Sequence, residues 1–259
     1  MSEAVLLHES RDAVATLTLN RPAQFNALSA ELLTELERAL AALAGDAGVR
    51  VVVLAAAGRG FCAGHDLREI RALGDARRIE ALFLHCSRVM QQLLALPQPV
   101  IARVHGIATA AGCQLVASCD LAIASSAARF ATPGVDIGAF CATPGVAVSR
   151  ALARKHALEL LLTGAAIDAE RACAIGLVNR VVAPEELDAE VAALAQRLAS
   201  KSPRALASGK RLFQRQLELP VEEAYALASA AIARDFASPD GMEGVDAFLA
   251  KRAPVWKGR

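Results

Sequence analysis

The stretch from Val49 to Ile70, VRVVVLAAAGRGFCAGHDLREI, decides the fold. Its first half is a continuous apolar run rich in valine, which is typical of a strand buried on both faces of a sheet. A glycine-rich turn from Gly58 to Gly64 ends this strand, and a similar turn occurs further along in HGIATAAGCQLVASCD. Strands that lead through glycine turns into helices favour an α/β fold with parallel strands.

Neighbouring segments extend this pattern. AVATLTLN alternates apolar and polar residues up to Asn20, which predicts a strand, and Ser29 is expected to cap a leucine-rich helix. A further helix is expected from about Asp75 to Leu96. PVIARVHG predicts another strand, AAGCQLVASC a helix, and LAIAS and ARFATP two short strands. The first two-thirds of the chain are therefore expected to form one α/β core.

From Ala183 onward the sequence becomes a succession of helices, whose starts are marked by Pro184, Pro203 and Asp240. No linker or low-complexity segment separates this region from the rest of the chain. We therefore expect two parts: an α/β core at 1–182, and a helical C-terminal region at 183–259.

The composition excludes several classes of protein. The 259 residues are 54% hydrophobic with a net charge of +1, so neither nucleic acid nor an anionic membrane is expected as a partner. No apolar run approaches the ~20 residues that span a bilayer, and the first ten residues lack a secretory signal pattern. We expect a cytoplasmic protein. Its six cysteines form no CxxC pair and no zinc-ligand spacing, which favours buried, reduced thiols.

The two glycine turns are candidate binding sites, because they expose backbone N–H groups next to a helix N-terminus. Gly58, Gly60 and Gly64 miss the spacing of a dinucleotide fingerprint by one residue, and no phosphate-loop lysine follows either turn. Nucleotide binding is therefore not expected. Close packing alone explains many such turns. Two of them after buried strands favour a sharper hypothesis, in which each turn donates one N–H to the same oxygen and forms an oxyanion hole.

Four motifs, in this order, resemble the enoyl-CoA hydratase/isomerase, or crotonase, superfamily: LNRPAQFNAL, GFCAGHDLREI, VHGIATAAGCQLVASCDLAIAS and FATPGVDIGAFCATPG. The resemblance covers essentially the full chain. It implies a spiral of repeated β-β-α units, followed by a helical region that forms homotrimers or homohexamers. It also implies that the chain binds acyl-CoA thioesters, with coenzyme A as part of the substrate and with no further cofactor and no metal.

The resemblance assigns the oxyanion hole to the backbone amides of His65 and Ala111. The two catalytic glutamates of well-characterised hydratases correspond to Gln114 and Gly134, and neither residue transfers a proton near neutral pH. Space for a carboxylate is expected at Gly134, so Gln114→Glu combined with Gly134→Glu is expected to raise hydratase activity. Asp136 is a candidate proton-transfer group, with a surface charge as the alternative.

Further positions are expected to bind coenzyme A by resemblance. Those along the pantetheine are Gln24, Phe25 and Ala27. Those near the adenine are Ala63, Asp66 and Leu67. Arg68 is expected to reach a phosphate, with a solvated helix charge as the alternative. Phe248 and Lys251 are expected to reach the adenine and phosphates of a neighbouring subunit, with an ordinary helix end as the alternative.

The missing glutamates leave three functions open. The combination of Gln114 and Gly134 is similar to the mitochondrial enoyl-CoA hydratase domain-containing subgroup. The first function is an enzyme of hydratase or isomerase type that stabilises a thioester enolate. The second is a non-catalytic acyl-CoA-binding protein, and the third is a thioester hydrolase in which Gln114 positions water. Cys141 and Thr143 are expected to line the site, but the thiol lacks a convincing base partner.

Overall fold

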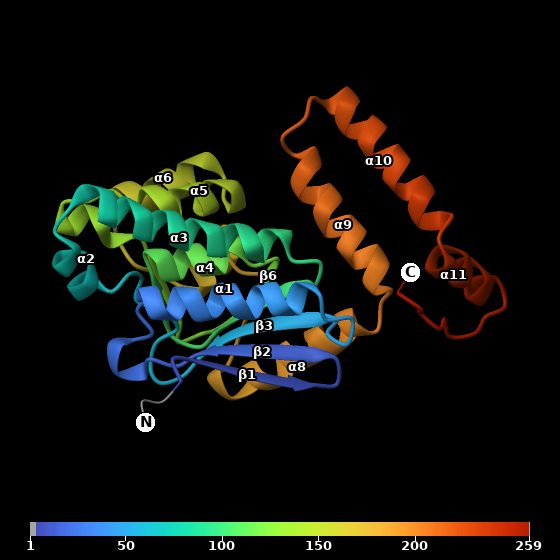
Figure 1. Ribbon diagram of the computed structural model, residues 1–259, viewed down its shortest axis with the longest axis horizontal. Coiled ribbons are helices and arrows are strands. Elements are labelled where there is room, and N and C mark those ends of the chain that lie inside the picture. The colour runs from blue at the N-terminus through green and yellow to red at the C-terminus, as the bar shows by residue number, and fades with distance from the viewer. Residues whose placement is uncertain (1–3, 259) are drawn as a thin grey trace.

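A six-stranded sheet runs through the centre of the computed structural model, which describes residues 4–258 (Figure 1). Its order is β1-β2-β3-β4-β6-β9, and all neighbouring pairs are parallel except β1 with β2. The strands are β1 (Leu6–Arg11), β2 (Val14–Leu19), β3 (Val51–Ala56), β4 (Val100–Val104), β6 (Leu121–Ser125) and β9 (Arg180–Val182). The predicted parallel α/β fold is confirmed; β1 and β9 were not predicted.

A second, three-stranded sheet accompanies the first. Its strands, in the order β5-β7-β8, are β5 (Ile107–Thr109), β7 (Arg129–Ala131) and β8 (Ile167–Asp168). Along the chain, β4 and β5 are followed by α4 (Ala111–Ser118), and β6 and β7 by α5 (Ala142–Ala151). Each unit thus contributes one strand to each sheet and then a helix. The expected repetition of β-β-α units is confirmed.

Helices cover both faces of the large sheet, which explains why β3 is buried along its whole length. Val52 and Leu54 belong to the main core beneath α1 (Ala30–Ala44), α3 (Ala76–Ala95) and α4. Val51 and Val53 point to the opposite face, where α8 (Leu187–Ala199) covers them. Figure 1 shows α1 and α3 on one side of the sheet and α8 on the other. The continuous valine run is therefore a consequence of this two-sided burial.

Helix α1 forms for the reasons that the sequence suggested. Ser29 is its N-cap, and the Ser29 hydroxyl accepts a hydrogen bond from Leu32 N at 3.2 Å. Five leucines with helical spacing face the core: Leu32, Leu33, Leu36, Leu40 and Leu43. The predicted cap and buried face are both confirmed.

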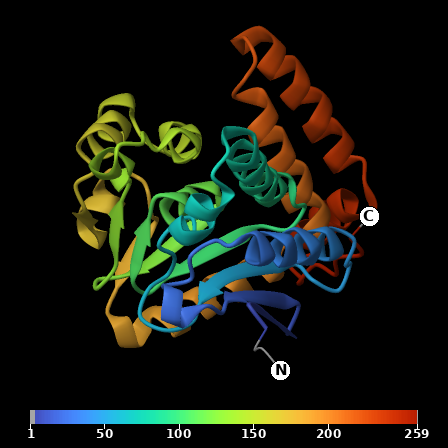
Figure 2. The same ribbon diagram turned by 60° about the vertical axis from the view of Figure 1, so that its left-hand side comes forward.

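The last three helices form an arm that projects from the core (Figures 1 and 2). They are α9 (Pro203–Gln216), α10 (Val221–Phe236) and α11 (Pro239–Leu249), and they contact one another. The expected division at residues 182 and 183 follows the change in sequence. The packing, by contrast, divides the chain between α8 and α9, because α8 lies on the sheet.

The remaining helices connect the strands around the core. They are η1 (Pro22–Gln24), α2 (Leu67–Leu73), η2 (Pro133–Ile137), α6 (Arg154–Thr163), α7 (Ala169–Ala174) and η3 (Pro184–Glu186). Among the described residues, no helix is both long enough and apolar enough to cross a membrane.

Candidate functional site

The loops that follow β2, β3 and β4 meet at one edge of the sheet, because these three strands are parallel neighbours. The Asn26 side chain ties the first loop to the second. Its Nδ2 donates to Ala57 O and Gly60 O, both at 2.8 Å, while its Oδ1 accepts from Arg21 N at 2.8 Å. Asn26 is fully buried and its amide is satisfied at both ends.

Two backbone bridges extend this assembly to the third loop. Cys62 N donates to Ile107 O at 3.0 Å, and Thr109 N donates to Cys62 O at 2.9 Å. In the other bridge, Leu28 N donates to Gly64 O at 2.8 Å and Asp66 N donates to Leu28 O at 3.1 Å.

The N–H of His65 lies outside these bonds, because a parallel bridge uses the groups of the residues on either side of it. Within residues 4–258 it makes no hydrogen bond.

The backbone turns sharply just before α4. Ala110 has φ 50° and ψ −117°, a conformation that favours glycine, and Ala111 is the first residue of the helix. Ala110 N donates to Ala131 O at 2.9 Å, and Ala110 O accepts from Gln114 N at 3.0 Å. The N–H of Ala111 makes no hydrogen bond within the described part of the chain. It is one of the free amides that every helix start provides.

The two turns are in direct contact at Gly64. A Cβ built on Gly64 would lie 2.9 Å from Ala110 Cβ and 3.3 Å from Ala111 N. Gly64 also has φ +92°, which strains any residue with a side chain. His65 and Ala111 each follow a residue with positive φ, and the turns that carry their free amides touch. This arrangement fits the predicted pair of oxyanion donors.

Gln114 lies one helical turn after Ala111 and is only 3% exposed. Its Oε1 is buried without a hydrogen-bond partner, and its Nε2 has no partner among the described residues either. Side chains on a helix lean back toward its N-terminus. The Gln114 amide therefore leans toward the end of α4 that carries the Ala111 N–H, and both of its ends are free to bind a ligand or a water.

The expected space at Gly134 does not exist, and this prediction was wrong. A Cβ built on Gly134 would lie 2.2 Å from Ala139 O and 2.8 Å from Cys141 Sγ. The Gly134 N–H also donates to Cys141 Sγ at 3.3 Å. The segment after η2 folds back and fills the volume in which a side chain would start. Gly134→Glu requires backbone movement, so the double restoration with Gln114→Glu cannot be expected to work.

The surroundings of Asp136 favour the surface-charge alternative over proton transfer. It is exposed, and a Cβ built on Gly164, at the end of α6, would lie 3.1 Å from Asp136 Oδ2. Asp136 makes no ion pair among the described residues. Burial raises the pKa of the Cys141 thiol, which keeps it protonated and poorly nucleophilic. The Thr143 Oγ1 is buried without a partner.

The ring of His65 is not suited to proton transfer. It contacts Phe83 of α3 with ring centroids 4.4 Å apart, and its Nε2 is buried without a partner. Burial lowers the pKa of His65 to about 4. The ring is therefore neutral at physiological pH, and the backbone amide is the group of His65 suited to the site.

This burial predicts a pH dependence of stability. Unfolded His65 binds a proton near pH 6.5 and the folded residue only near pH 4, so the free energy of unfolding falls as the pH drops through this window. Each pKa unit corresponds to about 1.4 kcal/mol, which gives a loss on the order of 3 kcal/mol over the whole window and about 2 kcal/mol between pH 7 and pH 5. We expect His65→Phe, which keeps the backbone N–H, to flatten this dependence in urea unfolding at pH 7 and pH 5. An unchanged slope would contradict the assignment.

The residues expected along coenzyme A gather beside the first two loops. Ala63 N donates to Phe25 O at 3.0 Å, and the ring of Phe25 faces the guanidinium of Arg59 at 5.1 Å. Gln24 and Leu67 are exposed nearby in the chain, whereas Ala27 is buried.

The Asp66 carboxylate is already bonded to groups of the first two loops. Its carboxylate caps α2 by accepting from Arg68 N at 3.1 Å, and it pairs with Arg21 Nη2 at 3.0 Å. Burial opposes ionisation of Asp66, but the Arg21 and backbone hydrogen bonds outweigh it and lower the pKa. The Arg68 side chain is exposed and makes no ion pair among the described residues, as the solvated-charge alternative requires.

Phe248 and Lys251 do not join the site within one chain. Phe248 lies on α11 and is 83% exposed, and Lys251 follows that helix. Figure 1 shows α11 at the opposite end of the molecule from α2. Any contact of these two residues with a ligand at the loops requires a second copy of the chain.

Sequence reasoning assigned no role to Arg21 and Asn26, although both lie in the first quoted motif. Arg21 pairs with Asp66 and donates to Ala27 O, and Asn26 joins the first two loops. Arg21 and Asn26 are the first and last residues of RPAQFN, a segment that follows a buried strand. Two polar residues at the ends of such a loop are the signal that could have revealed them. Asp66, Ala57 and Gly60 lie 31 to 45 residues away from these side chains, which no local pattern indicates.

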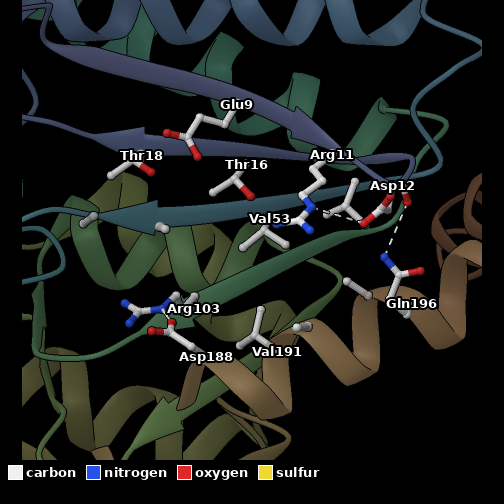
Figure 3. Close-up of a pocket in the computed structure, with 15 residues that line it drawn as sticks. Glu9, Arg11, Asp12, Thr16, Thr18, Val53, Arg103, Asp188, Val191 and Gln196 are labelled. Carbon is white, nitrogen blue, oxygen red and sulfur yellow. Dashed lines mark hydrogen bonds and ion pairs between the residues drawn. The ribbon is translucent and has the colours of Figure 1, made fainter. Parts of the chain in front are cut away.

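Large cavities lie away from these loops. One of about 740 Å³ opens on the α8 side of the sheet, where Figure 3 shows Thr16, Thr18 and Val53 facing Val191 and the Arg103–Asp188 ion pair. Another of about 930 Å³ lies between α9 and the core. Within residues 4–258, no group of three or more His, Cys, Asp and Glu is placed to hold a metal ion.

Comparisons with known proteins give consistent matches. The family model described as enoyl-CoA hydratase/isomerase matches residues 9–259. The mitochondrial enoyl-CoA hydratase domain-containing protein 3 of Xenopus laevis is 44% identical over 249 residues, which are 96% of this chain and 84% of that protein. Because that relative is mitochondrial by name, the cytoplasmic location expected for this chain remains a prediction.

Two crystal structures are similar along almost their whole length. An enoyl-CoA hydratase of Mycobacterium smegmatis has a TM-score of 0.96 and 53% identity, covering 98% of this chain and 99% of that one. The human enoyl-CoA hydratase domain-containing protein 3 has a TM-score of 0.94 and 43% identity, covering 97% and 100%.

Proposed function

Because the chain belongs to the enoyl-CoA hydratase/isomerase family, we propose that it binds an acyl-CoA thioester at the two glycine turns and stabilises its enolate there. The backbone N–H groups of His65 and Ala111 donate to the thioester oxygen. The observation that carries the proposal is that both amides lack partners among the described residues, while their turns touch at Gly64. Each such donor is worth about 3 kcal/mol in a transition state.

Coenzyme A extends from this oxygen across the first two loops. Gln24, Phe25 and Ala27 follow the pantetheine, and Ala63, Asp66 and Leu67 lie near the adenine, mostly through backbone contacts. The exposed Arg68 side chain is free to pair with a phosphate.

A neighbouring subunit supplies Phe248 and Lys251, because these residues lie far from the loops of their own chain. Large apolar side chains of the arm are exposed in the single chain: Phe213, Tyr225, Ile232, Phe236 and Phe248. Such a surface supports a homotrimer, or a hexamer of two trimers. Light scattering on the purified protein measures the assembly, and a monomer would exclude this completed site.

A second candidate function is a non-catalytic acyl-CoA-binding protein. One observation favours it, namely that Ala139 O and Cys141 Sγ fill the volume at Gly134, so the site lacks both hydratase carboxylates and room for one of them. Crotonyl-CoA separates the two candidates. Loss of its conjugated thioester absorbance indicates hydratase-type turnover, whereas binding in a calorimeter without this loss favours the binding protein or another enolate reaction.

Acetoacetyl-CoA tests the oxyanion hole itself, because its enolate has a distinct ultraviolet band. We expect the protein to bind it and to increase this band. Absence of both binding and spectral change would contradict the proposed function.

A further inference from the structure

We propose that the arm carries a second binding site, between α9 and α10, for a ligand with two or more linked phosphate groups. A cavity of about 310 Å³ lies between these helices, and four arginines line it: Arg204, Arg211, Arg215 and Arg234. Asp235 supplies the one carboxylate among the described residues around it, so four positive charges meet a single negative one. Because the whole chain has a net charge of only +1, the attraction for anions is concentrated at this place.

The spacing along α9 brings three of these arginines onto one face of the helix. Arg211 follows Arg204 by seven residues and precedes Arg215 by four, so the three form a stripe about 16 Å long. Arg234 lies in the last turn of α10, which packs alongside α9 (Figures 1 and 2). A stripe of this length suits several linked phosphates better than a single one.

The guanidinium groups of this cavity lack partners of opposite charge. Among residues 4–258, none of the four arginines takes part in an ion pair. The Nε of Arg204 is buried without a hydrogen-bond partner. The carboxylate of Asp240, whose pKa the charge of Arg204 helps to lower, is bonded elsewhere: it accepts from Ser202 Oγ at 2.6 Å and from Lys257 N at 2.7 Å. A buried donor without an acceptor is costly, and an anion in the cavity supplies that acceptor.

The chemistry of arginine points to phosphate. Guanidinium is a planar fork of N–H donors that matches phosphate oxygens, and it stays charged at every physiological pH. The cavity has room for about ten water molecules, which admits a diphosphate group. It is too small for an acidic helix of another protein, whose diameter is about 10 Å. A ligand that contacts both α9 and α10 links the two helices and stabilises the folded arm.

Inorganic diphosphate is the probe, titrated into the purified protein in a calorimeter at constant ionic strength. We expect a single diphosphate to bind per chain and to raise the unfolding temperature. Arg211→Gln combined with Arg215→Gln is expected to weaken this binding by about 10-fold or more, because two charge-assisted contacts are lost. Arg154→Gln combined with Arg197→Gln makes the same change of charge at two exposed arginines of α6 and α8, and should leave binding unchanged.

Three outcomes would overturn the arm site. The first is no diphosphate binding by the wild-type protein, and the second is an equal loss of binding in both double variants. The third is a loss of binding in Arg68→Gln but not in the arm variant, which would place the diphosphate at the loops proposed for coenzyme A. None of these outcomes affects the proposed function, because acetoacetyl-CoA binding is measured separately.

Discussion

Gly64→Ala is expected to weaken enolate stabilisation by about 100-fold, measured as the affinity for the enolate form of acetoacetyl-CoA. The added Cβ would lie 2.9 Å from Ala110 Cβ and 3.3 Å from Ala111 N, so the two turns must separate. Separation moves one donor away from the shared oxygen, and one oxyanion donor is worth about 3 kcal/mol. Because φ at Gly64 is +92°, strain and overpacking should also lower the free energy of unfolding by about 2–4 kcal/mol.

Gly74→Ala is the matched control. Gly74 also has positive φ, at +61°, but nothing lies within 4 Å of a Cβ built there. This change should cost about 1 kcal/mol of stability through strain alone and leave acetoacetyl-CoA binding unaltered. If both variants lose enolate affinity equally, the contact between the turns is not what positions the donors.

Lys210→Met is expected to lower the free energy of unfolding by about 3–5 kcal/mol, because it leaves a buried carboxylate without its partner. Lys210 Nζ lies 2.7 Å from Asp120 Oδ2 and also donates to Leu93 O at 2.8 Å and Gln98 O at 3.1 Å. Its side chain is only 8% exposed. Burial raises the pKa of Asp120 despite Lys210. Since Lys210 lies on α9, its ammonium group links the arm to the C-terminal end of α3 and to the loops before β4 and β6.

Urea unfolding measures the loss, and limited proteolysis shows whether the arm becomes accessible. Lys201→Met removes an exposed lysine and should change stability by less than about 0.5 kcal/mol. Adding Asp120→Asn to Lys210→Met should recover part of the loss, because it removes the orphaned charge. A loss below about 1 kcal/mol in the single variant would show that other contacts hold the arm.

Several elements followed from local sequence alone. The valine run of β3, the Ser29 cap of α1 and the helix predicted from AAGCQLVASC each have a short-range cause, and all three were confirmed. The four motifs also predicted the family and its enoyl-CoA hydratase domain-containing subgroup, which the relatives bear out. The short strands β5 and β8 carry too little pattern to be recognised and were not predicted, whereas the three-residue β7 was predicted from ARFATP.

The sequence by itself determined the α/β class, the order of the longer helices and buried strands, and, through its motifs, the family. These properties depend on residue identity and on periodicity over one or two turns of chain. Only the tertiary structure decided what occupies the space at Gly134, which free amides lie on touching turns, and which helices belong to the core. Each of these depends on which distant segments meet: Gly64 with Ala110, Gly134 with Cys141, and α8 with β3. No local pattern encodes these contacts, because they form only when the whole core packs together.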